Sequence, residues 1–185
     1  VFDDLLDWND WFVRKRLLPP LGLVALGTYN DINHRSGNMQ DARFESGLDN
    51  SPMYDGDFYN STSGSGLTES GCGLMSLYDG GMSSMFVQEA YALANLSALV
   101  GRPDTLRAKL VARGDAMAAL IRDKLWDADS GNFVNKFVNG SFYRRITPTS
   151  FYALQAHAAG GVAPRLAVRP PAAAISLPAQ TGIAF

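Results

Sequence analysis

Residues 79–127, DGGMSSMFVQEAYALANLSALVGRPDTLRAKLVARGDAMAALIRDKLWD, decide the fold class, because their pattern predicts two long helices joined by a short turn. Apolar residues recur at helical spacing over residues 83–100, and Gly101 follows them where a helix C-cap is expected. Pro103 suits the first turn of the second helix. Since the connection is so short, the two helices are expected to pack antiparallel. The apolar residues of the first helix are Met85, Ala92, Leu93, Leu96 and Leu99.

Another helix is predicted before this pair, at residues 1–18 (VFDDLLDWNDWFVRKRLL). Its acids come early and its bases late, which complements the helix dipole, and Pro19-Pro20 ends it. Trp8 and Trp11 lie three residues apart on one face, so core packing is their expected role. A short helix that runs toward Gly47 is expected after an irregular stretch.

Three further segments follow the helix pair. Residues 130–142 (SGNFVNKFVNGSF) alternate in polarity and hold the turn signal Asn139-Gly140, which predicts a small β-hairpin. Residues 147–159 (TPTSFYALQAHAA) predict a last short helix, capped by one of its threonines. The remainder, residues 160–185, is rich in Ala and Pro and has no period, so we expect it not to form packed structure.

The fold class expected from these elements is all-α: helical hairpins with long loops and one small β-hairpin. Helix pairs at this spacing fit a bundle, a solenoid or an α/α toroid. Because the sequence shows no 34-residue repeat, nothing in it favours the solenoid.

Composition excludes several classes of function. The 185 residues carry a formal net charge of -2, which does not indicate binding to nucleic acid or to an anionic membrane. The sequence has no apolar run long enough for a membrane span. Cys72 is the single cysteine, and His34 and His157 lie far apart, so neither a disulfide nor a zinc site is expected. No phosphate-cradling motif is present, and we expect no cofactor and no metal.

The segment FESGLDNSPMYDG, residues 44–56, crowds carboxylates among turn residues. On a helix, Glu45 and Asp49 would share one face, about 5–6 Å apart at Cβ. Like charges that close raise the pKa of one partner, and a protonated carboxyl group near neutral pH is what a general acid needs. Solvated acids at a helix end explain the same spacing. The two are no complete glycosidase pair, because such carboxyls flank the scissile bond from opposite sides.

The stretch ARFESGLDNSPMYD, residues 42–55, resembles the acid-bearing motif of glycoside hydrolase family 63. That family includes processing α-glucosidase I and related mannosylglycerate- and glucosylglycerate-type hydrolases. Three further stretches resemble the family in the same order, so the resemblance covers about residues 1–158. They are DWNDWFVRKR (7–16), DGGMSSMFVQEAYALANLSALVGRP (79–103) and LWDADSGNFVNKFVNGSFYRRITPTSFYALQA (125–156).

The resemblance implies part of an (α/α)6 toroid that cleaves an α-glycoside with inversion, acting on a carbohydrate substrate. By motif position, Asp49 is similar to the general acid that protonates the glycosidic oxygen. Glu45 and Asn50 in the same motif would then surround this acid or contact sugar. With them, Tyr54 and Asp55 are candidate substrate-binding residues.

One departure from the family concerns the general base, which the resemblance places on a Glu near the C-terminal end of the toroid. No Asp or Glu occurs here after Asp129. We therefore expect residues 1–158 to be a partial glycosidase domain, residues 159–185 to be a tail outside the family, and the chain alone to be inactive. A partial toroid would also leave apolar helix faces open, so self-association is expected. The alternative is a small all-α binding or scaffold module with an acidic ligand-recognition loop.

Overall fold

The computed structural model describes residues 1–27, 39–48, 50–54, 59–60 and 74–158, and these residues are mostly helical. The α-helices are α1 (Phe2–Lys15), α2 (Met39–Phe44), α3 (Gly80–Leu99), α4 (Asp104–Leu125) and α5 (Tyr152–Gln155), with 3-10 turns η1 (Pro52–Tyr54) and η2 (Pro148–Phe151). The strands are β1 (Leu17–Leu18), β2 (Leu23–Val24), β3 (Tyr59–Asn60), β4 (Leu74–Met75), β5 (Leu77–Tyr78), β6 (Trp126–Asp127), β7 (Asn132–Phe133), β8 (Asn135–Phe137) and β9 (Phe142–Tyr143).

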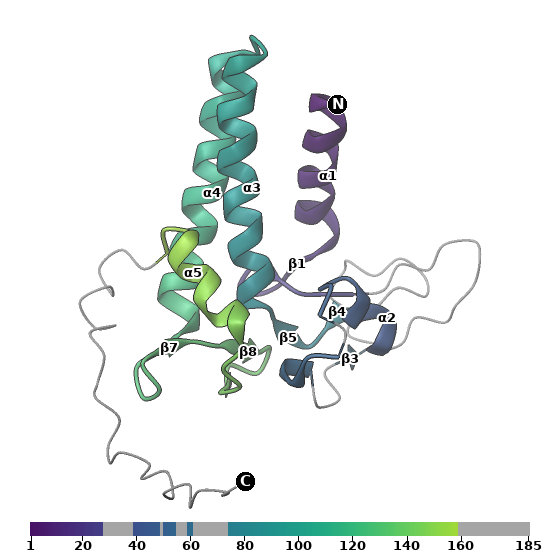
Figure 1. Ribbon diagram of the computed structural model, residues 1–185, viewed down its shortest axis with the longest axis vertical. Helices are drawn as coiled ribbons and strands as arrows, with labels where there is room; N and C mark the ends of the chain where they lie inside the picture. The colour runs from purple at the N-terminus through teal and green to yellow at the C-terminus, as the bar shows by residue number, and fades with distance from the viewer. Residues whose placement is uncertain (28–38, 49, 55–58, 61–73, 159–185) are drawn as a thin grey trace, which may run out of the picture.

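The predicted helix pair is confirmed as α3 and α4, which form the tallest part of the molecule (Figure 1). Gly101 has φ +69° in the connection between them, a conformation that favours glycine. The helices approach closely at Gly114, where an added Cβ would lie 2.7 Å from the ring of Tyr91. Helix α3 begins three residues earlier than predicted, because the Asp79 side chain caps it by accepting from the Met82 amide at 2.8 Å.

Helix α1 stands beside α3, and the short α5 packs against the lower half of the pair (Figure 1). Helix α1 ends at Lys15, three residues short of the predicted end at Leu18, because Leu17 and Leu18 pair with β2 as strand β1 ahead of the Pro19-Pro20 turn. The strands β1 and β2 flank that turn and bring Leu23 and Val24 into the core. The last helical segment begins with a capping box, in which Thr147 and Ser150 satisfy each other's backbone amides.

Three buried apolar clusters occur among the described residues: one joins Phe2 of α1 with Leu93, Ala94 and Leu110 of the helix pair, and the other two are larger. The larger lies between α1, α3, α4 and β2, and includes Leu23, Val24, Ile121 and Leu125, all fully buried. The smaller lies under the segment that follows α2 and contains Leu26, Ala42, Met53, Tyr54, Met75 and Leu77. That segment is therefore anchored to the fold by its own buried side chains.

The sequence predicted a single β-hairpin, whereas the described residues form more β-structure than that. The hairpin is present as β8–β9, with Asn135 opposite Tyr143 and with Gly140 at φ +92° in the turn. Its neighbour β5 extends it to three strands, and three further two-stranded ladders occur among the described residues. These strands are two or three residues long, too short for a period-2 pattern to reveal them. The described fold is mostly helical with small sheets at one end.

Candidate active site

The acid-bearing segment, residues 44–54, is tied to the fold near its first end by Glu45. The Arg16 guanidinium forms a bidentate ion pair with this carboxylate, with Nε to Oε2 at 2.8 Å and Nη2 to Oε1. The backbone amide of Gly27 also donates to Oε2, at 2.9 Å. Arg16 is buried, and its guanidinium lies 4.4 Å from the ring centroid of Trp11. The Glu45 side chain is thus fixed in place against a buried guanidinium.

The second anchor is Tyr54 at the far end of the segment. Its hydroxyl donates to Asp79 Oδ2 at 2.8 Å, and its backbone carbonyl accepts from Arg43. Burial raises the pKa of Asp79 above its usual value, and burial likewise raises the pKa of Tyr54. Asp79 therefore caps α3 with one oxygen and holds the acid-bearing segment with the other.

The candidate residues named from sequence fall in different places. Asp49 and Asp55 lie outside the described residues, so their predicted roles stay predictions. Asn50 is exposed. The spacing argument gave Glu45 an acidic neighbour, whereas its described partner is the cation Arg16, which comes from α1's end and is 29 residues away. Sequence spacing could not find this tertiary partner.

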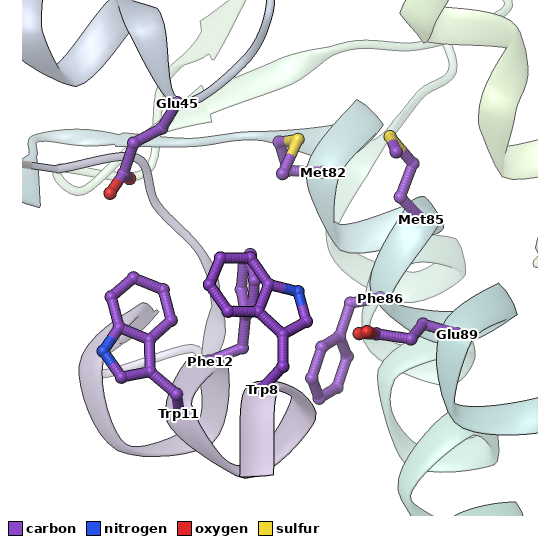
Figure 2. A pocket seen from close by; sticks show the side chains of 8 residues that line it. All are labelled: Trp8, Trp11, Phe12, Glu45, Met82, Met85, Phe86 and Glu89. Carbon is purple, nitrogen blue, oxygen red and sulfur yellow. The ribbon is translucent and has the colours of Figure 1, made fainter. Parts of the chain in front are cut away.

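Two neighbouring cavities adjoin this segment and share Met82 and Met85 as a wall. The first, which we call the aromatic cavity, has a volume of about 410 Å³ and lies between α1 and α3 (Figure 2). Its lining comprises Trp8, Trp11, Phe12, Glu45, Met82, Met85, Phe86 and Glu89. The second, the acid-loop cavity, has a volume of about 190 Å³. Its lining comprises Ser46, Leu48, Tyr54, Asp79, Gly81, Met82, Met85, Thr149 and Tyr152.

The expected core role of the two tryptophans is wrong for Trp8, which is 53% exposed. Its ring stacks on that of Trp11, with centroids 5.2 Å apart and planes 4° from parallel. The face of α1 that enters the interior carries Phe2, Asn9 and Phe12 instead. The i, i+3 spacing placed the two rings together correctly but could not show which face of the helix is covered.

Three further residues of the site were missed from sequence. Asp79 precedes the first turn of α3, and an N-cap signal could have identified it. Glu89 lies on α3 and lines the aromatic cavity, where Asn9 donates to its Oε2 at 2.8 Å and burial raises its pKa. Arg16 carries no local signal, because a basic residue after a helix is ordinarily solvated.

Comparison with known families gives the class of protein. A family model for glycoside hydrolases matches most of the chain, which makes it a glycoside hydrolase domain. The chain belongs to the mannosylglycerate hydrolase MGH1-like glycoside hydrolase domain family, whose model matches residues 1–172. The resemblance carried by the ESGLDNSP segment is thereby confirmed. The match extends beyond residue 158, and the division of the chain there stays a prediction.

No curated protein matches the chain significantly. In the part of the chain that the structure describes, every helix is too short or too polar to cross a membrane. Membership of a glycoside hydrolase family implies a carbohydrate substrate.

Proposed function

We propose that this chain is part of an inverting α-glycosidase that acts on α-linked glucosides or mannosides, that it forms part of an (α/α)6 toroid, and that Asp49 is the general acid. The observation that supports this most is the anchoring of the segment around Asp49 at both ends. Arg16 and Gly27 hold Glu45, while Asp79 holds Tyr54. A general acid must be positioned within hydrogen-bond reach of the leaving oxygen, and the two anchors fix described residues on either side of Asp49.

The proposed roles of the neighbouring residues follow from their contacts. Glu45 is occupied by Arg16, so it positions the loop and offers its remaining acceptor capacity to sugar hydroxyls. Tyr54 is 1% exposed and its hydroxyl is bonded to Asp79, so we propose that its ring reaches substrate only where it lines the acid-loop cavity. Asn50 is exposed beside Asp49 and can contact sugar through its amide, and Asp55 is proposed as a further substrate contact.

Inversion needs a second carboxylate on the opposite side of the sugar, roughly 6.5–9.5 Å from the acid, to activate water. Residues 130–185 contain no Asp or Glu to take the place of the family's base. We therefore expect the chain alone to cleave no α-glycoside in plain buffer. The family match favours this enzyme over the alternative of a binding or scaffold module.

An external nucleophile tests the proposal without the missing base. Azide needs no deprotonation, so it can attack C1 of the non-reducing glucosyl unit of maltose. The glycosidic C1–O bond then breaks, and the leaving oxygen takes the proton from Asp49. We expect slow, azide-dependent release of glucose with formation of a β-configured glycosyl azide, detected by proton NMR. Robust hydrolysis in plain buffer, or an α-configured azide, would contradict the proposal.

Self-association through open apolar helix faces stays a prediction. Phe151 and Leu154 are exposed large apolar side chains on η2 and α5. We expect light scattering coupled to size exclusion to show a mass that rises with concentration, and a Phe151→Ser, Leu154→Ser double variant to lower it. A constant monomer mass across the accessible concentration range would contradict this.

A further inference from the structure

Three stretches of the sequence match Asn-X-Ser/Thr, the acceptor pattern for N-linked glycosylation: residues 60–62, 95–97 and 139–141. A pattern of only three residues often occurs by chance, so the availability of each asparagine depends on the fold. Residues 61 and 62 lie outside the described residues, and the structure therefore places only the other two stretches. They lie in contrasting positions, one inside the long helix α3 and one in the turn of a hairpin.

The stretch at residues 139–141 occupies the turn of the β8–β9 hairpin, at the end of the molecule opposite the α3–α4 connection (Figure 1). Phe137 and Ser141 close this turn, since the Phe137 amide donates to the Ser141 carbonyl at 2.8 Å. The Gly140 amide donates to the Phe137 carbonyl at 2.9 Å, and Gly140 has φ +92°. A three-residue hairpin loop with glycine at its left-handed position is set by the local sequence.

The turn presents the Asn139 side chain with its amide nitrogen toward solvent. Oδ1 of Asn139 accepts from the Ser141 amide at 3.0 Å and from the Ser141 hydroxyl at 2.7 Å. Because a backbone N–H only donates, the atom that faces it is the oxygen, and within the described part of the chain no hydrogen bond occupies Nδ2. Residues 139–141 are all exposed, and a Cβ added at Gly140 would meet nothing within 4 Å. The space around the turn is therefore open to a bulky group.

The stretch at residues 95–97 differs from the turn in its serine. Asn95 is exposed on α3, but Ser97 is fully buried and its hydroxyl donates to the Ala94 carbonyl at 2.7 Å. The acceptor pattern requires the hydroxyl at its third position. In α3 that hydroxyl is reached only by opening the helix, whereas in the hairpin turn the Ser141 hydroxyl lies at the surface.

We propose that Asn139 is an acceptor for N-linked glycosylation and takes an oligosaccharide from a lipid-linked pyrophosphate donor. In this transfer Nδ2 attacks C1 of the first sugar, and the C1–N bond forms as the C1–O bond to the pyrophosphate breaks. The lipid pyrophosphate leaves with the bonding electrons, and a base of the transferase takes one Nδ2 proton. Residues 139–141 line neither the aromatic cavity nor the acid-loop cavity, so the modification does not depend on the proposed glycosidase function.

Translation of the full chain behind a cleavable secretion leader, with microsomes of the endoplasmic reticulum present, tests the proposal. Endoglycosidase H leaves one N-acetylglucosamine on each modified asparagine, and peptide mass mapping then gives the occupancy of each site. A readout based on deamidation would mislead, because an asparagine before glycine also loses ammonia spontaneously. We expect Asn139 to be modified in most chains, Asn139→Gln and Ser141→Ala to lose that glycan, and Ser141→Thr to keep it. These changes lie in an exposed turn, and the urea midpoint of each variant checks that the fold is kept.

A second measurement uses the purified, folded chain. A soluble asparagine glucosyltransferase, which moves glucose from UDP-glucose to the same acceptor pattern, encounters only the asparagines that the fold presents. We expect it to modify Asn139 at least about tenfold faster than Asn95, because the Ser97 hydroxyl becomes accessible only when α3 opens locally.

Three outcomes would overturn the proposal: an unmodified Asn139 in the microsomes, a glycan on Asn139 that persists in Ser141→Ala, or equal rates at Asn139 and Asn95 in the folded chain. Failure of the proposed glycosidase function is a separate result. Asn139→Gln should leave azide-dependent cleavage of maltose unchanged, because the turn lies outside the lining of both cavities.

Discussion

The ion pair between Arg16 and Glu45 gives the sharpest stability prediction. The Arg16 side chain is 3% exposed and that of Glu45 is 29% exposed, so the pair is intermediate between a surface and a buried ion pair. Arg16→Met keeps the length and apolar character of the stem but removes the bonds to Glu45, to the Lys15 carbonyl and over the Trp11 ring. Breaking a buried pair costs about 3–5 kcal/mol and an exposed one about 0–1 kcal/mol.

We therefore expect Arg16→Met to lower the free energy of unfolding by about 2–3 kcal/mol, with Glu45 still solvated enough to limit the loss. Urea unfolding at pH 7, followed by tryptophan fluorescence, measures this. Arg102→Met is the matched control. It removes an ion pair with Asp3, 39% and 72% exposed, and a contact with the Phe2 ring, so it should cost under about 1 kcal/mol.

A double-mutant cycle with Glu45→Gln separates the pair from the loss of the arginine stem. We expect Arg16→Met and Glu45→Gln to be non-additive by about 1–2 kcal/mol, because each removes the same contact. If Arg16→Met costs no more than Arg102→Met, or if the two changes are additive, the anchoring of the acid-bearing segment through Glu45 is wrong.

Two further predictions concern Tyr54 and Asp127. Tyr54→Phe should lower the free energy of unfolding by about 1–3 kcal/mol in the same urea assay, because it removes the hydroxyl that donates to the buried Asp79 carboxyl group. The control Tyr91→Phe removes an exposed bond to Asp115 and should cost about 1 kcal/mol or less. Equal costs would contradict the anchoring of the segment through Tyr54. The Arg144 guanidinium lowers the pKa of Asp127 to about 2. A lowered carboxyl pKa stabilises the fold above the unfolded value of 3.8, and this stabilisation is lost as pH falls from there toward about 2, so Arg144→Met should flatten the stability–pH curve in that window. An unchanged slope between pH 4 and 2 would contradict this.

Local patterns predicted the long elements well. Helical spacing, the turn at Gly101 and the Asn139-Gly140 turn are set by residues close in sequence, and α3, α4 and the β8–β9 hairpin agree with them. The remaining ladders join very short segments that lie apart in the sequence. A prediction from spacing alone cannot find such pairs, because the information lies in tertiary packing.

For the candidate site, too, the sequence predicted local features but not tertiary contacts. The motif found Glu45 and Tyr54 and put them on one segment, but it could not show that Arg16 and Asp79 hold them. The exposure of Trp8 could not be predicted from the sequence either, because it depends on which helix packs against α1. Polar partners in buried sites come from distant segments, so their identity appears only once the chain is folded.

The central claim is that Asp49 protonates the leaving oxygen, and the leaving-group dependence of Asp49→Asn tests it most directly. With azide as nucleophile, maltose needs a proton on its departing oxygen, whereas 2,4-dinitrophenyl α-glucoside departs as a stable anion. We expect Asp49→Asn to slow the maltose reaction by about 10²–10⁴-fold and to leave the dinitrophenyl reaction within a few-fold of the unsubstituted chain. Equal loss with both substrates, or no loss with maltose, would contradict the assignment of Asp49 as the general acid.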